Sequence, residues 1–407
     1  MAWWPAATGP ASSRAVRALP SVMNDLSASP GAGSGPASDP LVAVVLPPRE
    51  GFGPGQSGAI GLIARRRVPT PGFRTLVVGG PQSGPCYPNI EFRALRPAWW
   101  RPGNVNIRFA EAVSSLLRRF TPALIEVHNR PEIALYLARR LQRTPVTLLL
   151  NNDPQEMRAA RSHGERATLL RHLALVMGSS DYLRGRFLEG TGAPREAFVV
   201  VPNCIDLAEV PRLPKENLIL FVGRVVQEKG PDVFASACSV ALPQLPGWRA
   251  EIIGADRSSE NSPGTDFVRS VQATARAAGV TMTGYRDNPV VLEAMAKAAI
   301  VVVPSRWPEP FGITALEALA SGGALIVSPR GGLPEVAGEA AVYVDPDDAS
   351  AIAAAIVRLA QDPAARAALG EAGRQRARQF DVQAVMAQLA ELRRRVLSGT
   401  QTPLAAD

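Results

Sequence analysis

Two carboxylates, Glu309 and Glu317, flank the turn Phe311-Gly312-Ile313-Thr314 in the second half of the chain. The turn follows an apolar, β-branched run and leads into a predicted helix that carries Glu317. The start of a helix presents unpaired backbone N–H groups and the positive end of the helix dipole, so it favours a phosphate. Acids on both sides of an anion-binding turn contribute little to folding. They suit a ligand in which a phosphate is joined to sugar hydroxyls.

Two cations lie at another strand-to-helix junction of the same half. The apolar run Leu218–Val222 is followed by Gly223 and Arg224, and Lys229 comes after a short loop. Ligands of open α/β sheets bind beyond the carboxyl ends of the strands, where Arg224 lies. A guanidinium matches phosphate oxygens, and an ammonium adds a compact charge. Lys229 alone also fits a solvated loop, but the pair favours phosphate binding.

Apolar runs that read as strands alternate with helical stretches along the chain. Continuous Val, Ile and Leu runs separated by helices are typical of parallel sheets that are buried on both faces. Two such series predict an α/β protein with two doubly wound domains. The expected strands are Leu41–Leu46, Thr75–Val78, Leu124–Val127, Val146–Leu150, Leu173–Met177 and Phe198–Val201, then Leu218–Val222, Ala250–Ile253, Thr281–Thr283, Ile300–Val303, Ala324–Val327 and Val342–Val344.

The Pro-rich segment Asn203–Lys215 marks the expected domain boundary. We expect an N-terminal domain over residues 40–205 and a C-terminal domain over residues 206–380. After a break at Phe380-Asp381, a final helix over residues 381–397 is expected to pack back on the N-terminal domain. Residues 1–39 and 398–407 are predicted to be disordered tails.

Composition limits the function classes. The chain has 407 residues, of which 46% are hydrophobic and 20% charged, as in an ordinary globular enzyme. Three widely spaced cysteines match no disulfide or zinc framework, and no apolar run reaches the ~18 residues that span a bilayer. These features predict a cytoplasmic protein. The net charge of +8 favours anionic partners, and nucleotide-sugar phosphates or an anionic membrane face fit better than nucleic acid.

The two junctions together resemble the retaining glycosyltransferases of family 4, which have the GT-B fold of two Rossmann-like domains. Gly223–Gly230, read as GRVVQEKG, is similar to the family's G-R-x-x-x-x-K-G element, and Glu309 and Glu317 match its E-x7-E element. The resemblance covers most of residues 40–395 and is strongest between Leu218 and Asp345.

The resemblance implies a role for each of these residues. Arg224 and Lys229 would bind the donor diphosphate next to Gly223, and the turn of Phe311, Gly312, Ile313 and Thr314 would share its charge through backbone amides. Glu317 would accept hydrogen bonds from the ribose diol, and Glu309 would hold the donor sugar near the reacting centre. Charge that develops on the leaving diphosphate would be stabilised without a metal or other cofactor.

The N-terminal half carries weaker matches. Gly58 ends a glycine-rich loop and resembles the family position where the backbone approaches the donor phosphate; a flexible loop is the alternative. His128, at the end of a strand, resembles a family histidine that contacts the transferred sugar, and a hydrogen-bonded structural histidine is the alternative. Asn151-Asn152-Asp153-Pro154, at the end of the next strand, fits either acceptor contact or a turn. Cys204 stands where the family commonly has glycine.

Three charged segments can be explained without a catalytic role. Asp345-Pro346-Asp347-Asp348 reads as a turn rather than a metal site, and Arg393-Arg394-Arg395 reads as a solvated helix end. A basic and aromatic segment fits a membrane surface, a sugar acceptor or core packing; its residues are Arg93, Arg96, Trp99, Trp100 and Arg101.

The sequence therefore predicts a metal-independent, retaining glycosyltransferase that moves a sugar from a nucleoside-diphosphate sugar to a glycan or glycolipid acceptor. The resemblance suggests bacterial cell-surface polysaccharide or lipopolysaccharide synthesis. A sugar-nucleotide epimerase and a catalytically silent GT-B scaffold remain as alternatives, and the four charged residues of the two motifs weigh against the silent scaffold.

Overall fold

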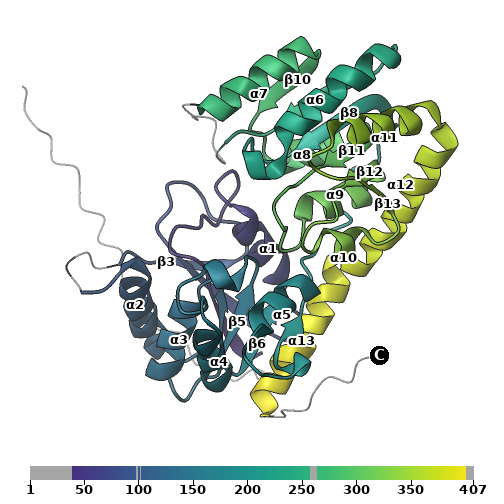
Figure 1. Ribbon diagram of the computed structural model, residues 1–407. Coiled ribbons are helices and arrows are strands. Elements are labelled where there is room, and N and C mark those ends of the chain that lie inside the picture. Colours follow the sequence, from purple (N-terminus) through teal and green to yellow (C-terminus); the bar gives the residue numbers. More distant parts are fainter. Residues whose placement is uncertain (1–38, 98–99, 101, 257–263, 400–407) are drawn as a thin grey trace, which may run out of the picture. The chain divides into compact units, whose positions relative to one another are not determined.

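The computed structural model describes residues 39–97, 100, 102–256 and 264–399 (Figure 1). The predicted tail over residues 1–39 lies outside the described residues except for Asp39, and so do residues 400–407 of the second tail. The described residues, from Asp39 on, form one compact unit. Among the described residues, no helix is both long and apolar enough to cross a membrane.

Seven parallel strands of the described chain form the first sheet, in the order β3-β2-β1-β4-β5-β6-β7. The strands are β1 (Leu41–Val45), β2 (Arg74–Gly79), β3 (Glu91–Ala94), β4 (Leu124–His128), β5 (Val146–Leu150), β6 (Leu175–Gly178) and β7 (Val199–Val200). Two apolar cores cover the two faces of this sheet. One face packs against the helices α2 (Val105–Phe120), α3 (Pro131–Arg140), α4 (His163–His172) and α5 (Asp181–Leu188). The other packs against α1 (Ala59–Arg67) and α13 (Val382–Ser398).

Six parallel strands form the second sheet of the described residues, in the order β10-β9-β8-β11-β12-β13. The strands are β8 (Glu216–Val222), β9 (Arg249–Ile253), β10 (Val280–Gly284), β11 (Ala298–Val303), β12 (Ala324–Val327) and β13 (Ala341–Tyr343). One face is covered by α6 (Pro231–Ala241), α7 (Asp266–Ala277) and α11 (Ala349–Gln361). The other is covered by α8 (Asn288–Lys297), α9 (Ile313–Ser321), α10 (Leu333–Ala337) and α12 (Pro363–Ala377).

The predicted fold class is therefore confirmed, and every expected strand exists within two residues of its predicted ends. Burial on both faces explains this agreement, because strands such as β11 and β12 consist of consecutive apolar residues that are all buried. The sequence did not predict β3. That strand is short, carries Glu91 and Arg93, and lies exposed at the edge of the sheet, so it has no apolar run to reveal it.

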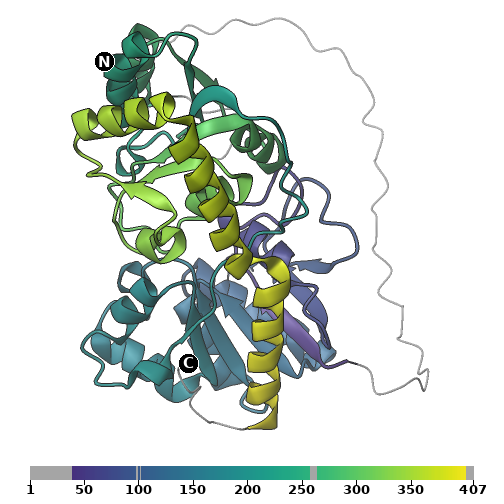
Figure 2. The same ribbon diagram turned by 90° about the vertical axis from the view of Figure 1, so that its right-hand side faces the viewer.

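The last helix crosses back to the first sheet, as Figure 2 shows for α12 and α13. Leu389 and Leu392 of α13 pack against Leu149 and Met177 of the first sheet. The assignment of Arg393 to a solvated helix end is wrong. Its side chain is 2% exposed, and its Nη2 lies 3.2 Å from Glu126 Oε2 on β4.

Candidate active site

A cavity of about 540 Å³ lies where the carboxyl ends of the two sheets face each other, and we call it the central cavity. Residues from both sheets line it. From the first half these are Ala59, Ile60, Ile63, Asn151, Asn152, Asp153, Glu156 and Asn203. From the second half they include Gly223, Arg224, Glu228, Lys229, Ser305, Trp307, Glu309 and the run Pro310–Thr314. Eight of the predicted site residues thus share one cavity, namely Gly223, Arg224, Lys229, Glu309, Phe311, Gly312, Ile313 and Thr314.

The turn after β8 leaves Arg224 available for a ligand. The Gly223 N–H donates to Ile253 O of the neighbouring strand at 3.0 Å, which fixes the backbone just before Arg224. A Cβ at Gly254 would lie 1.8 Å from Gly223 O, so only glycine fits at this crossing. Arg224 is exposed and forms no ion pair or hydrogen bond with another described residue.

Lys229 and Glu309 meet across the two junctions. Lys229 ends a short 3₁₀ helix, η3 (Gln227–Lys229), and its Nζ donates to Glu309 Oε1 at 2.5 Å. Ser305 Oγ donates to the same oxygen at 2.7 Å. Backbone N–H groups of Arg306 and Trp307 donate to Glu228 O, so the loop that carries Glu309 is tied to η3. The carboxylate is therefore held in place at the wall of the central cavity.

The first turn of α9 has no side chain that caps it, and no acid lies in it. Gly312 precedes the helix with φ of 101°, and a Cβ there would lie 2.5 Å from Leu333 Cδ2. Glycine is therefore required, and it brings the backbone of Gly312–Thr314 to the cavity. The uncapped N–H groups and the helix dipole make this wall attractive to an anion.

Glu317 does not line the central cavity in this structure. Its side chain is buried, and Oε1 accepts a hydrogen bond from Asn288 Nδ2 at 3.0 Å. Arg66 Nη2, on α1 of the other half, lies 3.8 Å from the same oxygen. Burial raises the pKa of the Glu317 carboxyl, and the charge of Arg66 opposes that rise. Its predicted contact with a ribose stays a prediction.

Gly58 is the N-cap of α1, as predicted, but a carboxylate of the chain already occupies that helix start. Glu50 Oε1 accepts the Gly61 N–H at 2.8 Å, and a Cβ at Gly58 would lie 2.9 Å from the same oxygen. Burial raises the pKa of Glu50, against the lowering effect of its backbone hydrogen bonds. A donor phosphate at Gly58 would have to replace Glu50.

His128 lies outside the central cavity and is 1% exposed. Its Nε2 lies 3.0 Å from Glu126 Oε1. Burial alone would raise the pKa of Glu126, but Arg393 and His128 lower it to about 2. Because an ionised carboxylate only accepts, His128 Nε2 carries the proton and Nδ1, which has no partner among the described residues, carries the lone pair. Burial lowers the pKa of His128, so the ring is neutral at pH 7.

Sequence reasoning missed Asn129, which follows β4, whereas acceptor contact or a turn were the two interpretations of Asn151 and Asn152 after β5. Asn129 adopts φ of 56°, and its Oδ1 accepts the N–H groups of Asn151 and Asn152 at 3.0 and 3.1 Å. The Asn151 side chain lines the central cavity, is 8% exposed, and finds no hydrogen-bond partner among the described residues. Polar groups this deeply buried usually have a partner, so Asn151 is suited to contact a ligand.

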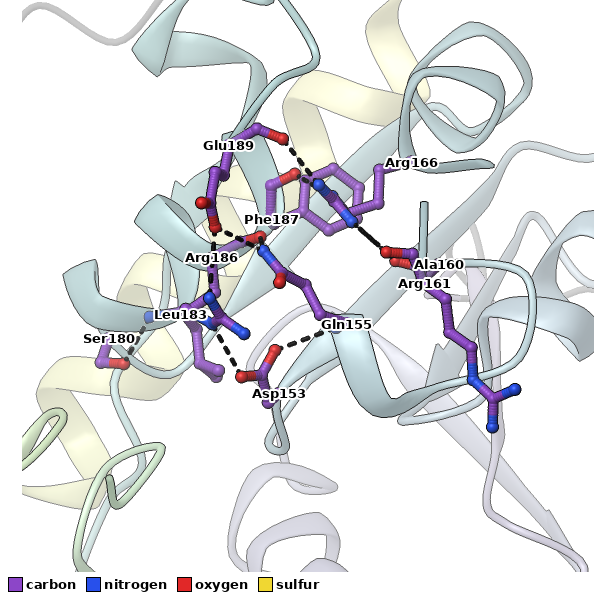
Figure 3. Close-up of polar contacts among 10 residues, drawn as sticks. All are labelled: Asp153, Gln155, Ala160, Arg161, Arg166, Ser180, Leu183, Arg186, Phe187 and Glu189. Atoms are coloured by element: carbon purple, nitrogen blue, oxygen red, sulfur yellow. Dashed lines mark hydrogen bonds and ion pairs between the residues drawn. The ribbon is translucent and has the colours of Figure 1, made fainter. Parts of the chain in front are cut away.

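The loop after β5 is held by charged side chains (Figure 3). Arg186 Nε lies 2.8 Å from Asp153 Oδ2, and Gln155 Nε2 donates to Glu189 Oε2 at 2.6 Å. Arg166 is 3% exposed and donates to four backbone carbonyls, those of Ala160, Arg161, Phe187 and Glu189. These contacts fix Asp153 toward Arg186, so its charge is already compensated.

Asp345–Asp348 forms a turn, in which Asp348 caps α11 by accepting the Ala351 N–H at 2.9 Å. Cys204 is buried without the positive φ that would require glycine, and the three cysteines are free thiols. Trp99 and Arg101 lie outside the described residues, whereas Trp100 is 71% exposed.

Two family models match the chain in succession. The model for glycosyltransferase family 4 matches residues 64–209, and the model for glycosyl transferases group 1 matches residues 206–376. Together they span most of the chain. The chain belongs to this family of GT-B glycosyltransferases.

Curated relatives carry names from the same enzyme class. The lipopolysaccharide core biosynthesis mannosyltransferase LpcC of Rhizobium leguminosarum bv. viciae is 29% identical over 308 residues, which are 72% of this chain and 79% of the relative. Glycogen synthase of Mycobacterium tuberculosis is 30% identical over 253 residues, and the match spans 59% of each protein. The chain thus spans about three fifths of that second relative's length.

Solved structures agree on the fold. HepE (Alr3699) of Anabaena, in complex with UDP-glucose, superposes with a TM-score of 0.69 at 18% identity, and the match covers 88% of this chain and all of HepE.

Proposed function

We propose that the protein is a metal-independent, retaining glycosyltransferase that moves a sugar from a nucleoside-diphosphate sugar to a glycan or glycolipid acceptor. The observation that carries the proposal is the meeting of Arg224, Lys229, the uncapped start of α9 and Glu309 in one cavity. Cations and amides suit a diphosphate, and a fixed carboxylate beside them suits the hydroxyls of the attached sugar.

In this proposal the diphosphate lies between Arg224 and the backbone of Gly312–Thr314. Lys229 can donate to a phosphate oxygen while it keeps Glu309, because an ammonium has three N–H groups. When the bond from the sugar to the phosphate breaks, negative charge grows on the diphosphate, and these donors are already aimed at it. The acceptor oxygen attacks from the same face, and the departing phosphate oxygen takes its proton, so the configuration is retained.

The acceptor would enter from the first sheet, where Asn151 and Asn152 line the central cavity. The relatives include a mannosyltransferase of lipopolysaccharide core synthesis, and we infer a role in cell-surface polysaccharide or lipopolysaccharide synthesis. A peripheral contact with an anionic membrane belongs to the same proposal, since Arg93, Arg96 and Trp100 are exposed on one segment.

Sugar nucleotides with different nucleosides and sugars, incubated with and without glycan acceptors, test the proposal. We expect a transferred sugar with the anomeric configuration of the donor, and the rate should survive EDTA. An epimerised sugar nucleotide formed without acceptor would indicate an epimerase. Binding without any turnover would indicate a silent scaffold, and complete loss in EDTA that Mg²⁺ restores would contradict the metal-free mechanism.

A further inference from the structure

A second cavity, of about 500 Å³, lies at the carboxyl edge of the first sheet beside the central cavity. We call it the arginine cavity. Three arginines line it, Arg49, Arg130 and Arg158, together with residues of the loops after β1, β4 and β5 and of the start of α2. Asn152, Asp153 and Glu156 line both cavities, so the two cavities share a wall.

The positive charges of this cavity are incompletely compensated by the chain. Arg49 and Arg158 are exposed, and neither forms an ion pair or hydrogen bond with another described residue. Arg130 is held, because its Nη1 donates to Asn129 O at 2.7 Å. Burial lowers the pKa of Arg130, and the nearby charge of Arg49 lowers it further, whereas Glu50 opposes the shift. The positive charges of Arg49 and Arg130 repel each other, and an anion bound between them would relieve this repulsion.

Three carboxylates line the arginine cavity, and two of them already have partners within the chain. Glu132 accepts hydrogen bonds from Asn104 Nδ2 at 2.7 Å and from Asn106 Nδ2 at 3.0 Å. Asp153 faces Arg186 (Figure 3). Glu156 is exposed, and its carboxylate has no partner among the described residues, so it would repel an anion or accept a hydrogen bond from a hydroxyl.

Neutral donors add to the cations. The Asn129 side chain is fully buried and lines the arginine cavity, and its Nδ2 has no hydrogen-bond partner among the described residues. Helix α3 begins at Pro131 on the same wall with no side chain capping its first turn. Both features present hydrogen-bond donors on the wall of the arginine cavity.

We propose that the arginine cavity binds an anionic group of the acceptor, a phosphate or a carboxylate carried on a saccharide, through Arg49, Arg158 and Asn129. This inference rests on the proposed function and names the acceptor class as acidic saccharides. With the anion held in the arginine cavity, an acceptor hydroxyl can extend past the shared wall of Asn152 and Glu156 toward the donor sugar. An uncharged acceptor would leave Arg49 and Arg158 without a counterion.

The test measures binding by calorimetry with the central cavity saturated by the nucleoside diphosphate that binds best. The probes are inorganic phosphate, mannose 6-phosphate and glucuronate, with mannose and glucose as uncharged counterparts. The variants are the double substitution R49Q/R158Q, E156Q, and R119Q as the matched control. Arg119 is an exposed arginine of α2 that lines neither cavity.

We expect at least one anionic sugar to bind more tightly than its uncharged counterpart, and to lose about 100-fold in affinity in R49Q/R158Q, since each lost charge-assisted bond accounts for about tenfold. E156Q should bind the same probe more tightly, because a repelling charge is gone, and R119Q should match the wild type. The better of mannose 6-phosphate and glucuronate identifies the anionic group. Equal affinity in R49Q/R158Q and the wild type, or no binding of any anionic probe at millimolar concentration, would overturn the inference.

The same titrations separate this inference from the proposed function. Nucleoside-diphosphate affinity should be unchanged in R49Q/R158Q and should fall in Arg224→Ala. Failure of the wild type to bind any nucleoside diphosphate would contradict the proposed function alone. A diphosphate site that depends on Arg224, with anion binding that ignores Arg49 and Arg158, would contradict only the inference about the acceptor.

Discussion

The two sheets present their carboxyl edges to the same cavity, but the charged residues that follow β8 and those that lie on β4 are satisfied in opposite ways. At the edge of the second sheet, Arg224 is exposed and unpaired among the described residues, and Lys229 reaches Glu309 at the cavity wall. On β4 of the first sheet, Glu126 and His128 are buried and bound by the chain itself. The second sheet thus leaves charges available for a ligand, whereas β4 uses its charges to hold the fold together.

The largest effect should come from the buried ion pair of the first sheet. Arg393→Met removes the arginine that pairs with Glu126 and leaves His128 as its remaining partner, in a site where both members of the ion pair are at most 2% exposed. An unpaired buried charge costs about 3–5 kcal/mol of unfolding free energy, which urea denaturation measures. Arg394→Met is the matched control, because that neighbour pairs with Glu391 on the surface and should cost less than about 1 kcal/mol. Equal, small losses in both variants would contradict the structural role of Arg393.

The same pair predicts how stability depends on pH. The Glu126 carboxyl has a folded pKa of about 2 against an ordinary value of 4.5, so ionisation favours the folded state. Its contribution is fully present above about pH 4.5 and is lost as the pH falls toward 2. Glu126→Gln should therefore flatten the loss of unfolding free energy between pH 4.5 and pH 2. An acid profile that is unchanged in this variant would exclude Glu126 as its source.

Glu309→Gln should lower kcat more than it lowers the affinity for the nucleoside diphosphate. The carboxylate is fixed by Lys229 and Ser305, and we place it next to the transferred sugar. We expect a fall in kcat of roughly 100-fold, the size typical for loss of one preorganised polar group. Nucleoside-diphosphate affinity should stay within a few-fold. Glu339→Gln, at an exposed position outside the cavity, is the control, and a fully active Glu309→Gln enzyme would refute the assignment.

Arg224→Ala should give a smaller effect that appears in donor binding. Loss of a charge-assisted contact to the diphosphate is expected to weaken binding by about 1.5–3 kcal/mol. Folding should be unaffected, because Arg224 has no partner among the described residues. Arg276→Ala, in the last turn of α7 and outside the central cavity, is the control. Donor affinity that is the same in both variants would contradict the proposed role of Arg224.

The contrast between the two edges also explains what the sequence could predict. In the second half of the chain, each strand-to-helix junction is one short segment. The spacing of the residues within Gly223–Gly230 and within Glu309–Glu317 therefore suffices to predict which side chains lie together. The strands of both sheets were readable because they are buried on both faces. The exposed edge strand β3 had no such signal.

Around the first sheet, the place of a side chain depends on contacts between segments that are far apart in the sequence. Arg393 is one of three consecutive arginines, and nothing in that run distinguishes the residue that meets Glu126, 267 positions away. Asn129 has a positive φ, and its side chain joins the loops after β4 and β5. The only hint of this conformation in the sequence is that asparagine tolerates positive φ better than most residues. Gly58 was placed correctly at a helix start, but Glu50, which occupies that start, was not foreseen.

A crystal structure with a bound nucleoside diphosphate would test the central claim most directly. We predict that the two phosphates lie within hydrogen-bonding distance of Arg224, Lys229 and the amides of Gly312–Thr314. Phosphates bound away from these residues, with no contact to Arg224, would contradict the account.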